Sequence, residues 1–575
     1  MKLLKTLFIV VCITFGLYSC DEDALDLKPL SSVSEIDVFN DKALLSAYVN
    51  ETYTGVYHMH EANDLGTIGL EDLSYIKVQN TGGYNEYLTA QVTPDNGESL
   101  TKNRWGRCYG YIRHINSYFA NIEGSAVDQP SLDLLSAEMY FMRAYYYFEL
   151  LKWYGGVPLV DQRYGLEDKD VRLPRASIDE VVAFIVADLD RVISSSIGTI
   201  TSPTKASKGA AMAMKGRVLL YAASELFNPS NDMSKWTAAA AANKAVMDMS
   251  EYPLASDYGA MFNTSAYLDP EVIFAKEYNL LRSQGGSSGA NTLLFPNGYE
   301  GWQNAGPTQK FVDMFDMANG EQPLLADGSV NPASGYDPQN PYANRDPRLD
   351  DIVFYNDLPF KDRTVEFWAA FTDDGNGDPT GREFLKDGAG NLLVGKDSYA
   401  RGGEISLTGY AWRKHTEESL PNDHNKPPAV YTPDIFYRKA EFYLNYAETQ
   451  IALGNEGLAR DAINAIRARV NMPPIAYTGD DLVEAYRRER AIELSFESHR
   501  FFDIRRWKIA EDVMGQRQKG VWVEKLSTGG FVYNYDLVTA ASSGYAWHDR
   551  LYWAPIPRGE IVTSEGAWNN NPGYD

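Results

Sequence analysis

Pairs of amphipathic segments joined by short turns constrain the fold of this 575-residue chain more than any other feature. The clearest pair spans residues 433–453 and 456–470, with Gly454 and Asn455 at the turn between them. Apolar and small residues recur in each segment every three or four positions, which is the spacing of one helix face. Small residues on that face let two helices approach closely. The chain is therefore expected to build its core from paired helices.

The same organisation is predicted nearer the N-terminus. Gly and Pro residues at 155–158 end one helix, because glycine frees the backbone and proline lacks a hydrogen-bond donor. Ser177 and Glu180 form a capping box that starts another helix. Such pairs are similar to tetratricopeptide-type units and predict a mainly α-helical fold whose helix pairs form a right-handed scaffold. The helices expected here span residues 101–122, 131–150, 178–192, 208–227 and 234–249, and Gly209 and Gly216 are expected to allow close packing.

Two stretches are dominated by turn-forming sequences instead. Residues 253–432 contain Gly-Ser, Asn-Gly and Asp-Gly runs around one short predicted helix at 308–317, and residues 58–100 are also irregular. Aromatic side chains lie among these turns, and long loops inside a folded chain are usually functional. We therefore expect a loop-rich ligand-binding face. The expected organisation is one domain at 41–575, with a helical scaffold at about 41–252 and 433–510 and a loop-rich insert at about 253–432.

The N-terminus predicts the compartment. Two lysines precede an apolar run at residues 7–17, which is too short to span a bilayer and is typical of a signal peptide. The run ends in Leu-Tyr-Ser-Cys, which resembles a bacterial lipobox, although an ordinary secretory signal is the alternative. We predict a signal peptide at 1–19, a lipid on Cys20 and a linker at 20–40. Cys108 then has no partner for an intramolecular disulfide.

The charge limits the possible ligands. Lys and Arg number 53 and Asp and Glu number 78, which gives a net charge of −25. Nucleic acid is not an expected partner, since its phosphates require a basic face. A polyanionic ligand would need a local basic patch, so the charge favours a neutral ligand. No later segment is apolar enough for a membrane span, so membrane contact is expected only through the lipid anchor.

Catalytic and cofactor motifs are weak. The chain has seven His residues, no His-Glu-x-x-His and no phosphate loop ending in Gly-Lys-Ser/Thr, so neither a cofactor nor a metal is expected. Residues 285–289 match a nucleophile elbow but lack the flanking strand and helix, which favours a flexible loop. Residues 374–385 begin like a calcium loop, but Pro379 replaces the required Gly and Leu385 the required Glu, which favours a solvated turn.

Residues 487–507 carry the densest charge, with alternating Arg and Glu around an aromatic seam. One interpretation is an arginine clamp for an anionic ligand. The other is a structural network of ion pairs, formed because Arg490 and Glu493 are neighbours on a helix face. We favour the structural network.

Sequence blocks across nearly the whole mature chain resemble the SusD/RagB family of outer-membrane nutrient-binding lipoproteins. Each block alone is weak evidence for the family, but all of the blocks occur in the family's order, after a lipobox-like segment. The blocks are Arg143–Leu150 with Gly155–Leu159, Pro307–Phe315 with Asn319-Gly320, Arg345–Leu349, Thr408–Tyr410, Ala440–Glu448, the run ending at Arg506-Trp507, and Asn571–Tyr574.

The resemblance implies a SusD-like fold without catalytic activity, at the outer membrane and facing the cell exterior. Such proteins form a lid over a TonB-dependent transporter of the SusC type. They capture oligosaccharides, or peptides in one branch, and pass them to the barrel. A glycan is the favoured ligand here because Tyr and Trp are abundant in the loops. A peptide ligand is the main alternative, and a surface glycoside hydrolase is disfavoured by the absence of a catalytic constellation.

The resemblance also suggests where the ligand binds. Family sites draw aromatic side chains from the irregular stretch before the first long helix and from the loop before the Pro-Thr-Gln block. Aromatic rings suit the apolar face of a sugar, while polar groups suit its hydroxyls. The implied aromatic residues are Trp302, Tyr299, Phe295, Tyr84, Tyr87 and Tyr75, and the implied hydrogen-bonding partners are Asp72, Asn85 and Gln303.

Overall fold

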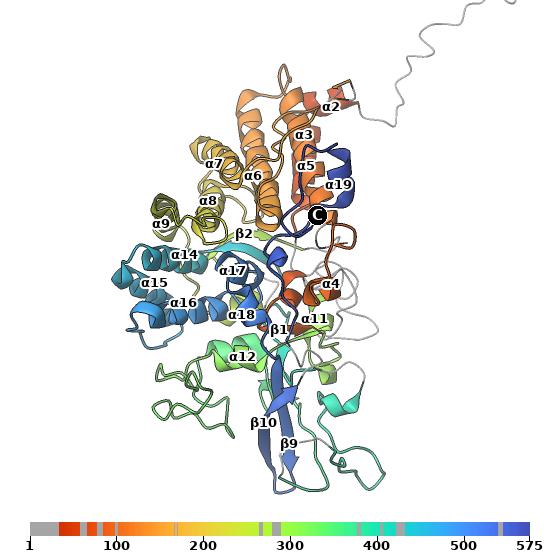
Figure 1. Cartoon of the computed structure of the whole chain (residues 1–575), viewed down its shortest axis with the longest axis vertical. Helices are drawn as coiled ribbons and strands as arrows, with labels where there is room; N and C mark the ends of the chain where they lie inside the picture. The colour runs from red at the N-terminus through yellow and green to blue at the C-terminus, as the bar shows by residue number, and fades with distance from the viewer. Residues whose placement is uncertain are drawn as a thin grey trace, which may run out of the picture.

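The protein is mainly helical, as Figure 1 shows for the computed structural model of the chain. The predicted signal peptide, Cys20, most of the linker, the elbow-like residues 285–288 and part of the calcium-like loop lie outside the described residues. The structure describes residues 34–57, 66–76, 84–97, 100, 102–165, 167–168, 171–263, 268–278, 289–375, 381–402, 406–420, 432–538 and 544–574.

Long helices dominate the two ends of the chain, and short elements fill the middle. The α-helices are α2 Glu35–Asn40, α3 Lys42–Thr54, α4 Tyr84–Leu88, α5 Lys102–Asn121, α6 Gln129–Tyr154, α7 Ile178–Ser194, α8 Lys208–Ala223, α9 Met233–Met247, α10 Tyr258–Phe262, α11 Gly289–Leu294, α12 Gln309–Asp313, α13 Arg348–Ile352, α14 Lys439–Ala452, α15 Glu456–Arg469, α16 Gly479–Glu493, α17 Arg500–Arg506, α18 Ala510–Met514 and α19 Arg558–Thr563. The 3-10 helices are η2 Gly66–Leu70, η3 Asn297–Tyr299, η4 Tyr399–Arg401 and η5 Asp549–Tyr552. The strands are β1 Ser74–Ile76, β2 Val272–Lys276, β3 Ala305–Pro307, β4 Val353–Phe354, β5 Pro359–Phe360, β6 Arg363–Thr364, β7 Ala411–Trp412, β8 Asp434–Arg438, β9 Lys519–Leu526 and β10 Gly530–Val538.

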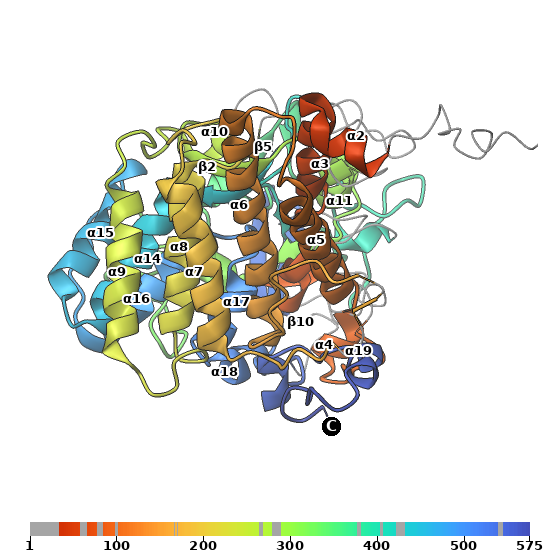
Figure 2. The same ribbon diagram turned by 90° about the horizontal axis from the view of Figure 1, so that it is seen from above.

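The long helices form one continuous array. Helices α5, α6, α7, α8 and α9 each pack on the next, as Figure 2 shows from above. Helix α14 then packs on α9 and also contacts α15 and α16, so the late helices extend the early ones. The prediction of a mainly helical fold built from helix pairs is confirmed.

A glycine and two asparagines join the early and late helices. A Cβ on Gly216 of α8 would lie 2.9 Å from the Oδ1 of Asn243 in α9, so glycine permits this close approach. The Asn243 side chain donates to the Gly216 carbonyl at 2.9 Å, and the Asn445 amide of α14 donates to Asn243 at 3.0 Å. The three helices thus satisfy their buried polar groups across one contact.

Three predicted helices are shorter than expected, and one of them, predicted at 208–227, ends at Ala223. The segment predicted as helix from 433 begins instead with strand β8, which pairs antiparallel with β2, and helix α14 starts at Lys439. The helix predicted at 308–317 is the short α12. The difference at α14 arises at the boundary of the loop-rich insert and the one at α12 arises inside it, and in both places a strand paired with a distant segment directly precedes the helix.

Five two-stranded antiparallel sheets occur within the described ranges. Strand β2 precedes most of the insert and β8 follows it. Because these two strands pair, the two ends of the insert lie side by side. The hairpin β9–β10 follows the last long helices and extends to the bottom of Figure 1, beside the insert.

Buried ion pairs tie the insert to the scaffold. Arg348 of α13 pairs with Glu489 at 2.6 Å and with Glu493 at 3.0 Å, both in α16. Arg438 of β8 pairs with Glu493 at 2.6 Å and with Glu271 at 2.9 Å. These side chains are nearly inaccessible to solvent, so the charges compensate one another without water.

The charged run at 487–507 forms part of this network. Its predicted structural role is confirmed, because Arg490 pairs with Asp503 at 2.7 Å and Arg506 pairs with Asp503 at 2.8 Å, both buried. The run is not one helix. Phe496 and Ser498 adopt positive φ angles of 56° and 61° between α16 and α17.

Gly155 ends α6 as predicted, and the glycine that follows it, Gly156, lies against the backbone of Ala176. A methyl group on Gly156 would overlap the carbonyl oxygen of Ala176, whereas one on Gly106 in α5 would meet nothing within 4 Å. We expect Gly156→Ala to destabilise the protein by about 1–3 kcal/mol through overpacking. Gly106→Ala should be neutral or stabilise it by up to about 1 kcal/mol, because alanine favours a helix. Thermal or denaturant unfolding of both variants measures the difference, and equal stability of the two would contradict it.

Candidate functional site

The two irregular stretches meet in one small sheet. Strand β1 pairs antiparallel with β3, with Tyr75 opposite Gly306 and Ile76 opposite Ala305. The Thr308 amide also donates to the carbonyl of Leu73 at 3.0 Å. Helix α11 packs on β3 and α4 packs on η2, which contacts β1, so these short elements form one body at the centre right of Figure 1. The structure therefore brings the two predicted regions together.

Trp302 lies in a tightly held loop of this body. Its backbone amide donates to the Thr292 carbonyl of α11 at 2.6 Å, and the Asn304 amide donates to Leu293 at 2.9 Å. A methyl group on Gly301 would overlap the carbonyl oxygen of Phe295, so glycine permits the loop to fold back. The Trp302 side chain is half-buried against the core and keeps part of its ring at the surface.

The other two aromatic residues of this loop are buried. Phe295 is inaccessible and packs edge-on against Phe354 and Phe360. The Tyr299 hydroxyl donates to the Phe360 carbonyl at 2.9 Å, and the Arg363 guanidinium lies 3.7 Å from the centre of the Tyr299 ring. Both side chains hold the loop that presents Trp302.

The tyrosines of the first irregular stretch also point inward. Tyr75, Tyr84 and Tyr87 are each less than 5 % exposed, and the Tyr84 hydroxyl donates to the Gly66 carbonyl at 2.7 Å. Residues three apart share one face of a helix, so α4 turns Tyr84 and Tyr87 to the core together. Asn85 lies between them in sequence and is exposed.

Asp72 anchors the body to the scaffold. Its buried carboxylate pairs with Arg500 of α17 at 2.8 Å and with Lys310 of α12 at 2.8 Å. Burial alone would raise the pKa of Asp72, but the two cations hold that pKa well below its ordinary value. The carboxylate is therefore charged and fully engaged beneath the surface.

Gln303 is the unusual polar residue of the loop. It is 2 % exposed and its φ is +48°, a conformation that costs an ordinary residue about 1–3 kcal/mol. Neither its Oε1 nor its Nε2 has a hydrogen-bond partner within the described part of the chain. A buried primary amide without partners, next to the half-exposed Trp302, is the arrangement of a polar group that a ligand or a bound water would satisfy.

A second aromatic cluster was not predicted from the sequence. Phe384, Tyr399 and Trp522 are half-buried, with the Tyr399 and Trp522 ring centres 3.6 Å apart. In strand β9, the half-buried Trp522 lies between the buried residues Val521 and Val523. Val521, Trp522 and Val523 are all apolar, so no alternation of apolar and polar residues could have placed Trp522 at the surface.

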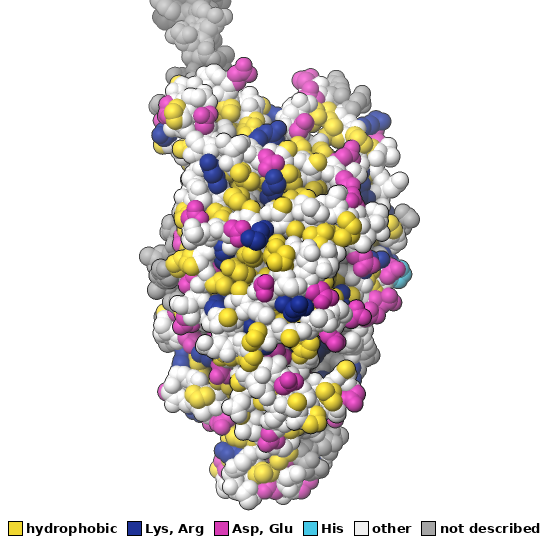
Figure 3. Space-filling model, turned by 90° about the vertical axis from the view of Figure 1, so that its left-hand side faces the viewer, with side chains coloured by type: hydrophobic (Ala, Val, Ile, Leu, Met, Phe, Trp, Pro, Cys, Tyr) yellow, Lys and Arg dark blue, Asp and Glu magenta, His cyan; other side chains and the backbone are white. Residues whose placement is uncertain are grey.

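The helical face carries side chains of both charges. Figure 3 views the helical face, where acidic, basic and hydrophobic side chains are interspersed. Among the described residues no group of three His, Cys, Asp or Glu side chains could hold a metal ion. None of the helices in the described ranges combines the length and apolarity required to cross a bilayer.

Comparison with known proteins identifies the family. The model of the SusD family matches residues 270–574, and a second model, described as starch-binding associating with outer membrane, matches residues 23–220. The chain belongs to the SusD family. It is 24 % identical to SusD-like protein P2 of Formosa agariphila, with all of both chains covered.

Two solved structures share the SusD fold. A SusD-like protein of Bacteroides fragilis has a TM-score of 0.73 and 26 % identity, covering 95 % of this chain and 100 % of its own. A SusD-like carbohydrate binding protein of the same species has a TM-score of 0.71 and 22 % identity, covering 91 % and 98 %. The SusD family is one of binding proteins.

The Asp72 ion pairs give a stability prediction. Asp72→Asn leaves the Arg500 guanidinium buried without its carboxylate, and we expect a loss of roughly 3 kcal/mol at neutral pH. Asp95→Asn is the matched control, because Asp95 pairs with Arg558 at 2.8 Å but both side chains are more than half exposed, and we expect a loss below about 1 kcal/mol.

The pH dependence has a defined sign. The folded state lowers the pKa of Asp72 below its ordinary value of about 4. The stability that the Asp72 carboxylate contributes is therefore complete above pH 4 and declines as the pH falls below 4. Unfolding midpoints of the wild type and Asp72→Asn should therefore converge in acid. A gap between them that widens below pH 4 would contradict this role.

Proposed function

We propose that this protein captures neutral oligosaccharides outside the outer membrane and passes them, uncleaved, to a SusC-like TonB-dependent transporter. The carrying observation is the half-buried Trp302 ring, which is followed in the chain by the buried, unpartnered amide of Gln303. An aromatic plate and an adjacent amide are the two elements that recognise the apolar face and the hydroxyl rim of a sugar. Asn85 is a further exposed hydrogen-bonding group on α4 of the same body.

Several independent observations support this proposal. A relative with the same fold is described as a carbohydrate binding protein, and the model that matches the N-terminal part is described as starch-binding. The net charge of −25 disfavours a polyanionic glycan. The proposed anchor is a lipid on Cys20, and the proposed transporter contact uses the helical face rather than the Trp302 surface.

Substitution of Trp302 tests both the class of ligand and the position of the site. We expect Trp302→Ala to weaken binding of the preferred neutral polysaccharide at least about tenfold, because loss of a stacked aromatic side chain removes about 1.5–3 kcal/mol of burial. Native gels containing single polysaccharides measure the retardation, and chromatography of the same mixtures detects any cleavage product.

Trp522→Ala is the matched control, since Trp522 is also a half-buried tryptophan but lies in the other aromatic cluster. It should retain wild-type retardation. If Trp522→Ala lost binding and Trp302→Ala kept it, the binding site would be the cluster of Phe384, Tyr399 and Trp522. Release of oligosaccharides would refute the binding role, and binding of peptides but of no glycan would favour the peptide-capturing alternative.

Cys20 tests the anchor in cells. We expect Cys20→Ala to abolish labelling by a fatty acid and to move the protein from the membrane fraction into the soluble fraction, because the described body has no apolar helix that could span the bilayer. Cys12→Ala is the control, since this residue precedes the proposed cleavage site and should leave labelling unchanged. Unaltered membrane retention of Cys20→Ala would rule out lipidation at this position.

A further inference from the structure

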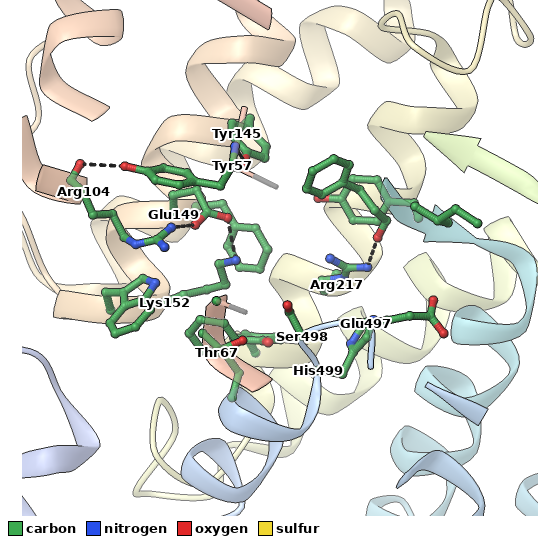
Figure 4. A pocket seen from close by; sticks show the side chains of 18 residues that line it. Tyr57, Thr67, Arg104, Tyr145, Glu149, Lys152, Arg217, Glu497, Ser498 and His499 are labelled. Atoms are coloured by element: carbon green, nitrogen blue, oxygen red, sulfur yellow. Dashed lines mark hydrogen bonds and ion pairs between the residues drawn. The ribbon is translucent and has the colours of Figure 1, made fainter. Parts of the chain in front are cut away.

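A small cavity of about 90 Å³ lies inside the helical scaffold. Helices α5, α6 and α8, strand β8, the segment that enters α17 and the start of η2 supply its walls, as Figure 4 shows from close by. None of its lining residues belongs to the loop of Trp302, so the oligosaccharide capture proposed above does not involve it. Because a buried water requires roughly 10–15 Å³, the cavity accommodates a monatomic ion with a few waters but no sugar ring.

Two cations on one side of the cavity share a single carboxylate. Glu149 pairs with Arg104 at 2.7 Å and with Lys152 at 2.5 Å, and Figure 4 shows the three side chains together. Two positive charges against one negative charge leave a surplus of +1. All three side chains are at most 12 % exposed, so bulk water and salt screen this surplus only weakly.

The carboxylates on the opposite side of the cavity are already paired. Glu441 accepts from Arg217 at 2.6 Å. Glu497 accepts from Arg438 at 2.8 Å and from Lys414 at 2.7 Å. Figure 4 shows Arg217 and Glu497 across the cavity from the shared pair. Neither carboxylate is therefore available to balance the surplus.

The histidine of the cavity wall adds no counter-charge and carries a donor. Burial first, and then Arg217 and the other nearby guanidiniums, lowers the pKa of His499 well below 6.5, so the ring is neutral. Its Nδ1 lies 3.4 Å from a nitrogen of Arg490, and a guanidinium can only donate. Since Nδ1 accepts, the proton of the neutral ring is on Nε2.

Both cations of the shared pair have further donors. An ammonium has three N–H groups and a guanidinium has five. Within the described residues, Lys152 pairs with Glu149, while Arg104 donates to Glu149 and to the Leu100 carbonyl at 3.3 Å. The Arg104 guanidinium otherwise lies over an aromatic ring, with the centre of the Tyr57 ring 3.8 Å away. Surplus positive charge together with unused donors is the chemistry of an anion site.

An adjacent cation adds to the surplus. A second void, of about 10 Å³, is lined by Lys152 and by Arg505 of α17. Arg505 donates to the carbonyls of Phe501 at 2.9 Å and Leu551 at 3.3 Å, and no carboxylate in the described part of the chain pairs with it. Burial lowers the pKa of Arg505 to about 9, as expected for a cation without a counter-charge. The interior around Lys152 therefore has an excess of positive charge on both sides.

We propose that the 90 Å³ cavity binds one small monovalent anion, which is chloride in a saline medium. The anion accepts from the Lys152 ammonium and the Arg104 guanidinium and balances the surplus of +1. It thereby holds α5 and α6 against the segment that enters α17. A polyatomic or multiply charged anion fits less well, because the volume is small and the surplus is a single charge.

Bromide locates the site, because it replaces chloride and scatters X-rays anomalously. Crystals of the full mature chain soaked in sodium bromide should show an anomalous peak inside the cavity. Trp302→Ala should show the same peak, since the site is independent of the oligosaccharide surface. The proposal is overturned if bromide occupies only surface positions while the cavity contains water.

Three variants test the charge argument. Lys152→Met leaves Glu149 paired with Arg104 and removes the surplus, so it should weaken chloride binding at least about tenfold, the effect of one lost hydrogen bond to an ion. Lys205→Met is the matched control, because Lys205 pairs with Glu138 at 2.9 Å and does not line the cavity. Glu149→Gln raises the surplus to +2 and should tighten chloride binding, which a carboxylate with only a structural role would not do.

The measurement is the saturable rise in unfolding temperature as sodium chloride replaces sodium gluconate at constant ionic strength. Comparison with Lys205→Met removes the general effect of the salts. An equal chloride dependence of the wild type and Lys152→Met would overturn the proposal, and so would weaker chloride binding by Glu149→Gln.

Discussion

The pairing of Arg438 with its carboxylates is the interaction on which the arrangement of this protein most depends. Arg438 ends β8, the strand that leads from the loop-rich insert into α14, and it contacts Glu271, Glu493 and Glu497 at 2.6–2.9 Å. Lys414 of the insert shares Glu497 at 2.7 Å. Burial opposes charge on Glu493, yet the surrounding arginines hold its pKa well below the ordinary value. These contacts fix the insert onto the helices in addition to the hydrophobic core that the two share.

The local features of the fold were predictable because short-range physical chemistry determines them. The Ser177 capping box, the Gly155–Pro158 stop and the packing at Gly216 all follow from side-chain size, hydrogen-bonding capacity or backbone freedom within a few residues. The start of α14 was not predictable in this way. Its first expected residues instead complete β8, whose partner β2 lies more than 150 residues earlier in the chain.

The candidate site was harder to predict for a related reason. Aromatic residues in an irregular stretch favour a ligand surface, but Tyr84, Tyr87 and Phe295 are buried. The spacing of Tyr84 and Tyr87 puts them on one face of α4, but only the tertiary structure shows that this face meets the core. Asp72 likewise became the partner of Arg500, a residue far away in sequence. Trp302 differs from the other aromatic residues because tight backbone hydrogen bonds hold its loop while the ring stays half-buried. Sequence reasoning therefore proposed the region, whereas the inward or outward direction of each ring required the tertiary structure.

The ion pairs also have a consequence for ligand capture. Asp72 connects the body that carries Trp302 to α17, and α17 is held to α16 and α14 through Asp503 and Arg506. A binding surface on loops would ordinarily lose affinity through the ordering of its side chains. Here the loop of Trp302 is fixed on one side by α11 and β3 and from below by a buried charge, so little ordering remains when a ligand binds. The buried charges thus preorganise the proposed ligand surface, which lies on short elements and loops.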